Sequence, residues 1–489
     1  MIAGHRAGRR RKTDRWRGRF GRLGATVERG AIPLPPGPKA SAVWQLLRYT
    51  HAPLAFLEGC RSRHGDPFTT RMAGYGALVM LSDPVAVKDV FRGDPQALHS
   101  GEGNEFASTI VGTNSVLVLD EEPHARQRRV LLPPFKGERM RSFFEAIQTA
   151  TLDEVRAWPV GRPIRMLEPM QRITVRVILQ AVLGLPPGPR LAGFEAQVRR
   201  LLAITRSRYS LIFVKLPLIG LLRKARWLPL FRPIHDLDES IFAFIAERRR
   251  LPVAERGENV LADLLATSHE DGKPLGDQEI RDAVLTMLLA GHDTTAVALS
   301  WTLEQVVPRG DVVERIADEL SRATGGGPPQ VDQLNQLTYL DAVIREGLRF
   351  RTILPFVVRL TKQVFRAGGR NYPPGILLCP CNHLVHRRPD LYPEPDAFRP
   401  DRFLTRHYAA NEWFPFGGGG RMCVGMAFAL YEMKVVLSTL FATVRLTRPP
   451  GSRSVAVRRG IALAPDDGAV MTVVTHYAEP GNAADTGRT

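Results

Sequence analysis

The residues with the clearest chemical potential are a cysteine and the glycines before it, in the run Phe416-Gly417-Gly418-Gly419-Gly420-Arg421-Met422-Cys423-Val424-Gly425. Four consecutive glycines let the backbone approach a flat ligand closely and leave N–H groups able to face a sulfur atom. Such donors, a nearby Arg421 and a metal would keep Cys423 as a thiolate. Helical sequence follows from Met426 to Leu440, so Cys423 is expected just ahead of a helix N-terminus, where the dipole favours an anion.

The glycine run has two competing interpretations. A phosphate-binding loop would need the Walker spacing with Lys-Ser/Thr, or a GxGxxG motif after a strand, and the run has neither. The other is an ordinary glycine-rich turn with a buried cysteine. The register in which Phe416, Arg421, Cys423 and Gly425 stand disfavours that interpretation.

A second candidate set, Ala290-Gly291-His292-Asp293-Thr294-Thr295, lies in the middle of a long predicted helix. The helix is expected to run from an N-cap at Asp277 to a stop at Pro308, about thirty residues or about 45 Å. Its centre is apolar enough to suggest a transmembrane span. His292 and Asp293 would each cost several kcal/mol in a bilayer, and we find no second span of this quality. We therefore expect a helix buried inside a large soluble protein, in which Asp293 alone could be an acid satisfied by a neighbour.

Charged residues at helical spacing form a third set. Glu346 and Arg349 stand at i, i+3 in the predicted helix 340–349, so they share one helix face. Such a pair is either exposed, in which case it adds little to stability, or buried in a network of polar contacts. Arg402, in the segment 398–403, is a candidate third partner.

Two basic residues one helical turn apart, His124 and Arg128, suit a ligand with paired anionic groups, although each alone could be a solvated charge. A different group could suggest zinc: Cys379, Cys381, His383 and His386. Cys-x-Cys is tighter than the usual zinc spacing. The alternating apolar residues around it indicate a strand instead.

The β-rich zones are few. One is 68–81, and another is Ile461–Leu463, which we expect to pair with Val470–Val474 in a hairpin across Pro465-Asp466-Asp467-Gly468. Helical patterns dominate the remainder, and the Gly/Pro-rich stretches are too short to separate domains.

Composition limits the class of protein. The chain has 489 residues, 44% hydrophobic and 24% charged, which is typical of a globular protein with a large core. Four cysteines do not form a disulfide framework, so a reducing cytoplasm is expected. The net charge is +18, with many arginines before residue 30. This leader has no apolar segment typical of a secretory signal; it is expected to be disordered, with a tail for nucleic acid or anionic lipid as the alternative.

Taken together, these motifs resemble those of the cytochrome P-450 family. Its heme-binding signature, Phe-x-x-Gly-x-Arg-x-Cys-x-Gly, is met by Phe416, Gly419, Arg421, Cys423 and Gly425. The resemblance extends from Pro35 to Thr475, with Asp401 in place of a family glutamate before Arg402. It implies a mainly α fold with small β-sheets, a triangular helical prism with a long central helix over the heme. The expected organisation is a basic leader at 1–32, a heme domain at 33–476 and a flexible tail at 477–489.

By this resemblance, Cys423 is the axial ligand of the heme iron. Asp293 and Thr294 deliver protons to bound dioxygen, for which Gly291 leaves room. The resemblance assigns heme propionates to His124, Arg128, Arg359 and Arg421. It gives a structural role, fixing the cysteine loop, to Glu346, Arg349 and Arg402.

The implied activity is a monooxygenase reaction, hydroxylation of a C–H bond, with heme b and O2. Electrons would come from NAD(P)H through a ferredoxin or flavodoxin and its reductase, because no flavin or iron–sulfur pattern is present. An apolar segment with interspersed basic residues, 211–231, is expected to cover the substrate entrance or to touch a membrane. Segments such as 131–135 resemble a bacterial subgroup with fatty-acid hydroxylases, so a fatty acid is the leading substrate, followed by terpenoid, steroid or polyketide skeletons. A monomer that binds no nucleic acid is expected; a heme-thiolate peroxygenase or isomerase, or a heme sensor, is the alternative.

Overall fold

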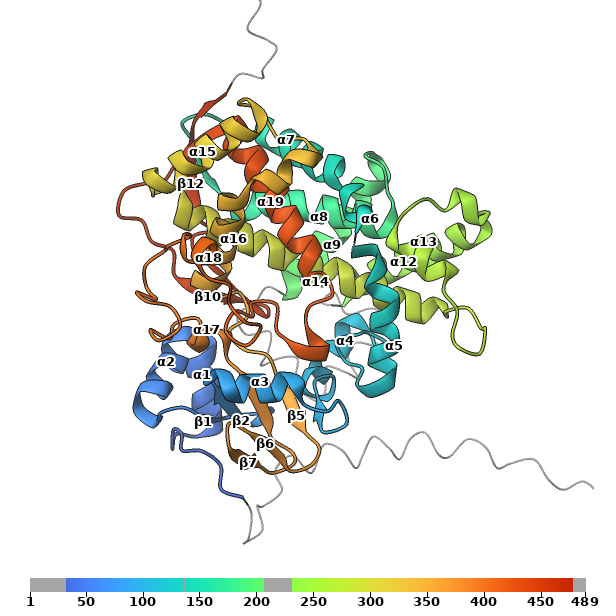
Figure 1. Ribbon diagram of the computed structural model, residues 1–489. Coiled ribbons are helices and arrows are strands. Elements are labelled where there is room, and N and C mark those ends of the chain that lie inside the picture. Colours follow the sequence, from blue (N-terminus) through green and yellow to red (C-terminus); the bar gives the residue numbers. More distant parts are fainter. Residues whose placement is uncertain (1–31, 136, 206–230, 478–489) are drawn as a thin grey trace, which may run out of the picture.

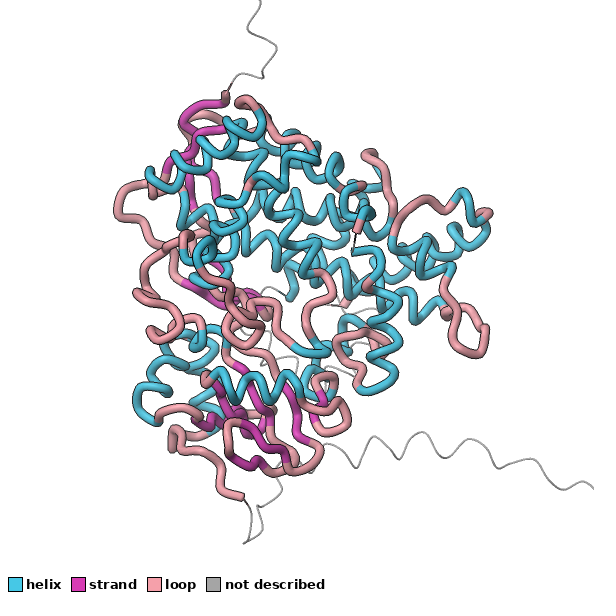
Figure 2. Tube along the Cα trace, viewed as in Figure 1, coloured by secondary structure: helices cyan, strands magenta, loops and turns pink. Residues whose placement is uncertain are grey.

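Helices make up most of the protein, and the strands gather in small groups, the largest of them at the bottom of the view (Figures 1 and 2). The computed structural model describes residues 32–135, 137–205 and 231–477. The expected leader (except Ile32), nearly all of the expected tail and most of the apolar segment 211–231 therefore lie outside the described residues. The predicted fold class, mainly α with small sheets, is confirmed.

The helices are distributed along the whole chain. The α-helices are α1 (Ala42–His51), α2 (Pro53–His64), α3 (Pro84–Arg92), α4 (Ser108–Val111), α5 (Glu121–Leu131), α6 (Glu138–Arg141), α7 (Phe144–Arg156), α8 (Leu167–Leu183), α9 (Pro189–Thr205), α12 (Arg232–Arg250), α13 (Val260–Ala266), α14 (Asp277–Val306), α15 (Gly310–Thr324), α16 (Thr338–Phe350), α17 (Asn382–Val385), α18 (Arg402–Thr405) and α19 (Met426–Thr443). Short 3-10 turns are η1 (Glu102–Ala107), η2 (Pro133–Phe135), η3 (Val253–Glu255), η4 (Val331–Gln336) and η5 (Gly419–Arg421).

The strands form one larger sheet and three small ones. The larger sheet has the order β1-β2-β8-β5-β3 and lies beside α1, α2 and α3 (Figure 1). Its strands are β1 (Phe68–Met72), β2 (Gly76–Leu81), β3 (Leu98–His99), β5 (Arg359–Thr361) and β8 (Leu377–Pro380). The others are β4 (Pro163–Arg165), β9 (Val444–Thr447) and β12 (Val470–His476) in one sheet, β6 (Phe365–Ala367) with β7 (Arg370–Tyr372), and β10 (Ala456–Arg459) with β11 (Ala462–Pro465). The expected strands within 68–81 and around Leu378 are confirmed.

The long helix α14 crosses the centre of the molecule (Figure 1). It begins at Asp277, one residue earlier than predicted, because the N-cap is Gly276 rather than Asp277; the Gly276 N–H donates to Glu279. It packs against α8, α16 and α19. Residues 280–288 and 295–306 are buried, so protein rather than lipid covers this apolar helix.

The expectation of no second span-like helix is wrong. Met426–Thr443 is also long and apolar enough to cross a membrane, with 50% of its most apolar window buried, against 72% for Asp277–Val306. α19 is in contact with α7, α14, α15 and α16. Both apolar helices therefore owe their composition to a core between helices.

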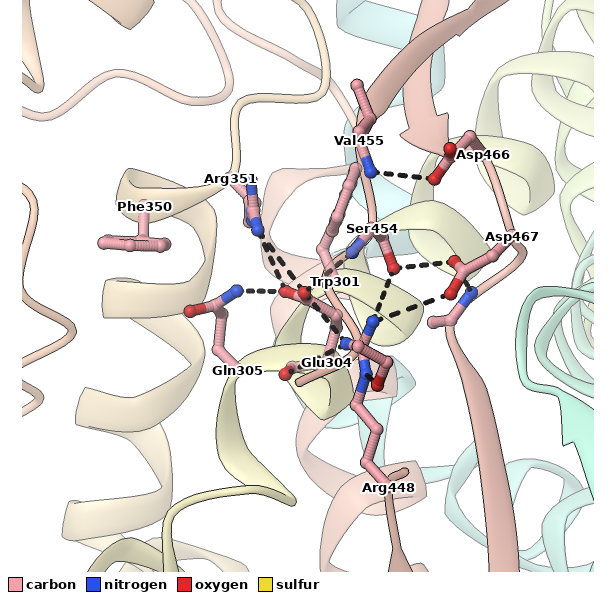
Figure 3. A network of polar contacts seen from close by, with 12 residues as sticks. Trp301, Glu304, Gln305, Phe350, Arg351, Arg448, Ser454, Val455, Asp466 and Asp467 are labelled. Carbon is pink, nitrogen blue, oxygen red and sulfur yellow. Dashed lines mark hydrogen bonds and ion pairs between the residues drawn. The ribbon is translucent and has the colours of Figure 1, made fainter. Parts of the chain in front are cut away.

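The predicted hairpin between 461–463 and 470–474 is also wrong, although strands form in both places. β11 pairs with β10, whereas β12 pairs with β4 and β9 in another sheet. Figure 3 shows the reason: Asp466 accepts a hydrogen bond from the Val455 backbone and Asp467 accepts one from the Ser454 hydroxyl. The turn residues bind the segment before β10, so the chain leaves the turn toward a different sheet.

Candidate heme-thiolate site

The cysteine loop closes on itself immediately before α19. The Cys423 N–H donates to the Phe416 carbonyl over 2.9 Å, and the Gly425 N–H faces the cysteine sulfur. Burial raises the pKa of the Cys423 thiol, while the Gly425 N–H and the Arg128 charge lower it. Cys423 is nevertheless accessible to solvent. Both facts hold if the thiol faces an accessible space that is largely surrounded by protein.

Two of the four glycines are required by a neighbouring helix. A Cβ atom on Gly418 would lie 2.3 Å from the Phe91 ring, and one on Gly419 would lie 2.0 Å from the Phe91 carbonyl oxygen. Phe91 belongs to α3, so these glycines let the loop sit directly on that helix. Gly420 has no atom within 4 Å of such a Cβ. The close approach that we expected toward a flat ligand is, at Gly418 and Gly419, an approach to protein.

The centre of α14 is the one stretch of that helix, apart from its first turn, whose residues are accessible to solvent. Ala290 is exposed and Thr294, one turn later, is partly exposed, whereas residues 280–288 and 295–306 on either side of this stretch are buried. The Thr294 hydroxyl donates to the Ala290 carbonyl over 2.6 Å. Hydroxyl groups that bond back to the helix carbonyls are known to bend or open a helix locally.

Gly291 does not have the orientation expected for it. A Cβ atom there would lie 2.9 Å from Ile178 of α8. The missing side chain therefore makes room for the neighbouring helix rather than for a ligand. This close contact brings Gln171 of α8 within 2.6 Å of Asp293 and the Thr174 hydroxyl within 3.0 Å of the His292 carbonyl.

The four predicted anion-binding residues gather around the cysteine loop. Arg128 donates to the Met422 carbonyl, and Arg359 donates to the Gly418 carbonyl over 3.2 Å. The charges of Arg421, Arg128 and Arg359 all act on His124. The sequence thus identified residues that the fold brings together from α5, β5 and the cysteine loop.

Their electrostatics favour an anion. Burial lowers the pKa of Arg359 to about 10, with a further contribution from the Arg421 charge. Burial, followed by the charges of Arg421 and Arg128, lowers the pKa of His124 to about 4, so the imidazole is neutral at pH 7. Burial also lowers the pKa values of Arg128 and Arg421. A bound dianion would stabilise these partly desolvated cations.

Asp120 is a member of this group that the sequence analysis missed. It forms an ion pair with Arg421 and accepts 2.8 Å hydrogen bonds from the Gly101 and Glu102 N–H groups. It stands one helical turn before His124, at the N-cap of α5, and that position was the available signal. Asp120 therefore joins the β3–η1 connection to the cysteine loop.

The third predicted set is buried, and Glu346 and Arg349 are completely so. Arg349 donates to both carboxylate oxygens of Glu346, over 2.6 and 2.8 Å. Arg402 donates to Glu346 over 3.2 Å. Arg349 also donates to three backbone carbonyls, those of His386, Pro395 and Ala397. The pair is thus the buried alternative, and it holds the chain between α17 and α18.

The comparisons with known proteins agree with this arrangement. A family model described as Cytochrome P-450 matches residues 34–470. The chain belongs to the cytochrome P-450 family. It is therefore an oxidoreductase of the heme-thiolate monooxygenase type, which uses heme and O2 with electrons from redox partners.

Similar family members are found in mycobacteria. A protein named as cytochrome P-450 135B1 of Mycobacterium tuberculosis is 35% identical over 440 residues, covering 90% of this chain and 91% of the relative. One named as cytochrome P-450 138 of the same organism is 33% identical over 442 residues, covering 89% and 95%.

Solved structures show the same fold. The retinoic acid-bound cyanobacterial CYP120A1 has a TM-score of 0.78 at 24% identity, covering 91% of this chain and 100% of that one. The heme domain of cytochrome P-450DA has a TM-score of 0.77, also at 24% identity, covering 91% and 98%.

The residues present fit the heme that the family binds. Three guanidinium groups gather at the loop of an accessible thiol; Arg421 pairs with a carboxylate, while Arg128 and Arg359 bond backbone carbonyls. Such a set suits the two carboxylates of a heme next to a sulfur ligand for its iron.

The suspected zinc residues have other partners. The Cys379 thiol faces the Leu377 carbonyl and the Cys381 thiol faces the Pro355 carbonyl. His383 bonds to Glu58, and His386 accepts a hydrogen bond from the Phe414 N–H. Burial raises the pKa values of both thiols, which disfavours the thiolates that zinc requires.

Proposed function

We propose that this cytochrome P-450 hydroxylates a hydrophobic substrate with Cys423 as the heme-iron ligand. The observation that carries the proposal is the accessible Cys423 thiol, with the Gly425 N–H on its sulfur and the cationic group of Arg128, Arg359 and Arg421 beside it. The prosthetic group is heme b, which when bound supplies oxygen activation and C–H oxidation.

The protein's own contribution is to orient the groups around the heme and to supply protons. The cationic group and His124 hold the two propionates. The accessible residues of α14, Ala290 and Thr294, would face the bound oxygen. Asp293 receives protons from solvent, and the Thr294 hydroxyl, which bonds back to Ala290, passes them toward the oxygen. Glu346, Arg349 and Arg402 keep the cysteine loop in place.

This proton route distinguishes a monooxygenase from the alternative, a heme-thiolate peroxygenase or isomerase. An acid–alcohol pair is needed when dioxygen must be reduced and protonated, and Asp293 and Thr294 stand together on α14. The test is Thr294→Ala in the purified enzyme with NADPH and its redox partners. Heme content should be unchanged, but reductant should be lost as hydrogen peroxide. Unchanged product per NADPH would contradict the proton-delivery role.

The substrate is proposed to be apolar. Ala290 is exposed on α14, and Val357, partly exposed, lies against Gly417 of the cysteine loop. Ile461 is half exposed next to β11, whose Leu463 is held by Trp301 of α14. A fatty acid stays the first prediction, with terpenoid, steroid and polyketide skeletons next. Retinoic acid belongs in the same panel because the protein of similar fold binds it. The test is a shift of the heme absorption on titration with each compound.

The electron donor is proposed to be an acidic ferredoxin or flavodoxin, reduced from NAD(P)H by its reductase. Arg126 and Arg129 are exposed on α5, whose Arg128 touches the cysteine loop, so basic side chains lie next to the thiol; Arg129 also pairs with Glu122. Arg126→Glu should slow reduction of the heme and weaken its salt dependence. A rate that is independent of salt and of this variant would exclude such docking.

The protein is proposed to act as a cytoplasmic monomer, with a heme domain from 33 to 476, and to bind no nucleic acid. Its four cysteines are all unpaired, which fits a reducing compartment. Peripheral membrane contact is also proposed: Val43, Trp44 and Leu47 are exposed together on α1, which follows the arginine-rich leader after a short proline-rich stretch. Sedimentation with phosphatidylglycerol vesicles should be lost in Trp44→Gln, and no sedimentation of the wild type would refute the contact.

A further inference from the structure

The face of α8 that touches the centre of α14 carries residues spaced along one side of the helix. Gln171, Thr174 and Ile178 stand at i, i+3 and i+7, a single helical face. Ile178 packs where Gly291 lacks a side chain. Thr174 donates to the His292 carbonyl, and Gln171 donates to Asp293. Successive turns of α8 thus contact successive residues around the proposed proton route.

The contact with Asp293 is short and partly buried. Gln171 is 6% exposed, and its Nε2 atom lies 2.6 Å from Oδ1 of Asp293. An ionised carboxylate can only accept hydrogen bonds, so the amide presents its NH2 group. This donor is neutral. Unlike an arginine or a lysine, an amide orients the carboxylate without placing a full charge beside it.

The backbone around Asp293 is held as well. Hydroxyl groups donate to the carbonyls of three consecutive residues: Thr294 to Ala290 over 2.6 Å, Thr295 to Gly291 over 2.9 Å and Thr174 to His292 over 3.0 Å. These bonds fix the helical turn, so the freedom that remains for Asp293 is the rotation of its side chain. Gln171 restricts that rotation.

We propose that Gln171 is a positioning residue for proton delivery, acting through Asp293; this rests on the proposed monooxygenase function. Gln171 has no assigned contact with substrate or heme. Its hydrogen bond keeps the carboxylate in the rotamer from which a proton passes toward Thr294. Loss of the bond should slow directed proton delivery through Asp293 and Thr294, so that reduced dioxygen takes its two protons from water instead and leaves as hydrogen peroxide.

The experiment uses the holoenzyme with NADPH and redox partners. Gln171→Met keeps the length of an unbranched side chain and removes the donor. Gln180→Met is the matched control, because Gln180 also lies on α8 and is partly buried. We expect normal heme content and substrate affinity in both. Gln171→Met should give several-fold less product per NADPH and correspondingly more hydrogen peroxide, and the control should match the wild type.

Two further readouts separate positioning from simple packing. Hydrogen peroxide supplies oxygen that is already reduced and protonated, so peroxide-driven product formation by Gln171→Met should stay within about twofold of the wild type. Added to Asp293→Asn, Gln171→Met should cause no further loss of product per NADPH, because both changes act on one group. The shifts of the urea midpoint should likewise be non-additive in the double variant.

The failures are distinguishable. A wild type that forms no product from NADPH and O2 with any substrate of the panel contradicts the proposed function itself. A coupled wild type with an equally coupled Gln171→Met overturns the positioning role. The positioning role is also overturned if Gln171→Met loses peroxide-driven turnover and heme in parallel, because Gln171 would then serve only the packing of the protein.

Discussion

Removing the charge of Glu346 should destabilise the protein strongly. Glu346 and Arg349 are both 0% exposed, and Glu346 also accepts hydrogen bonds from the Arg399 N–H and from Arg402. Glu346→Gln keeps the shape of the side chain but leaves buried guanidinium groups without a compensating charge. Breaking a buried pair in this way costs about 3 to 5 kcal/mol. Because proteins are stable by only about 5 to 15 kcal/mol, the loss is a large fraction of the total.

The same helix offers a matched control. Asp341 pairs with Arg345 over 2.6 Å, but both side chains are 34% exposed. Asp341→Asn should therefore cost less than about 1 kcal/mol. The assay is urea unfolding of both variants by circular dichroism, together with heme content, because Arg349 holds the chain that leads to the cysteine loop. Equal unfolding midpoints for the two variants would refute the argument from burial.

Three other changes test the site. Gly418→Ala should lower heme incorporation severalfold, because the added methyl group collides with the phenylalanine of α3. The control Gly420→Ala should incorporate heme normally, because a Cβ atom there meets no other atom. Equal heme incorporation by the two variants would contradict the steric account. Arg359→Gln should release heme to apomyoglobin at least about tenfold faster, as expected for a lost charged contact, and Arg366→Gln, which is exposed on β6, should not. In the heme-free protein the pKa of His124 lies near 4, below its usual value of 6.5. As the pH falls, His124 is therefore protonated in the unfolded chain before it is protonated in the folded protein. The free energy of unfolding should decrease between pH 6.5 and pH 4, and His124→Gln should reduce that decrease.

Local motifs were predictable from the sequence because their residues are close together along the chain. The cysteine loop with its following helix, the long central helix and the Glu346–Arg349 pair all depend on spacing within one element. Even the contact of Glu346 with Arg402 was predictable, because Arg402 lies in a recognisable segment of its own, 398–403.

Contacts between distant elements were not predictable where no recognisable motif links the two partners. Asp120 and Arg421, or Gln171 and Asp293, meet only after helices far apart in the sequence have packed. The roles of the glycines depended on the same packing, since Gly291 faces a neighbouring helix. The prediction of the hairpin was wrong for a similar reason. The turn residues specify a reversal of the chain, but tertiary contacts determine with which strands β11 and β12 pair.

The central claim is that the Cys423 thiolate binds the heme iron. The most direct test is the absorption spectrum of the dithionite-reduced holoprotein with carbon monoxide, measured for the wild type and for Cys423→His. We predict a strongly red-shifted Soret band for the wild type and a band at the position of histidine-ligated hemes for the variant. A wild-type band already at the histidine position, or a red-shifted band that survives in Cys423→His, would contradict the account.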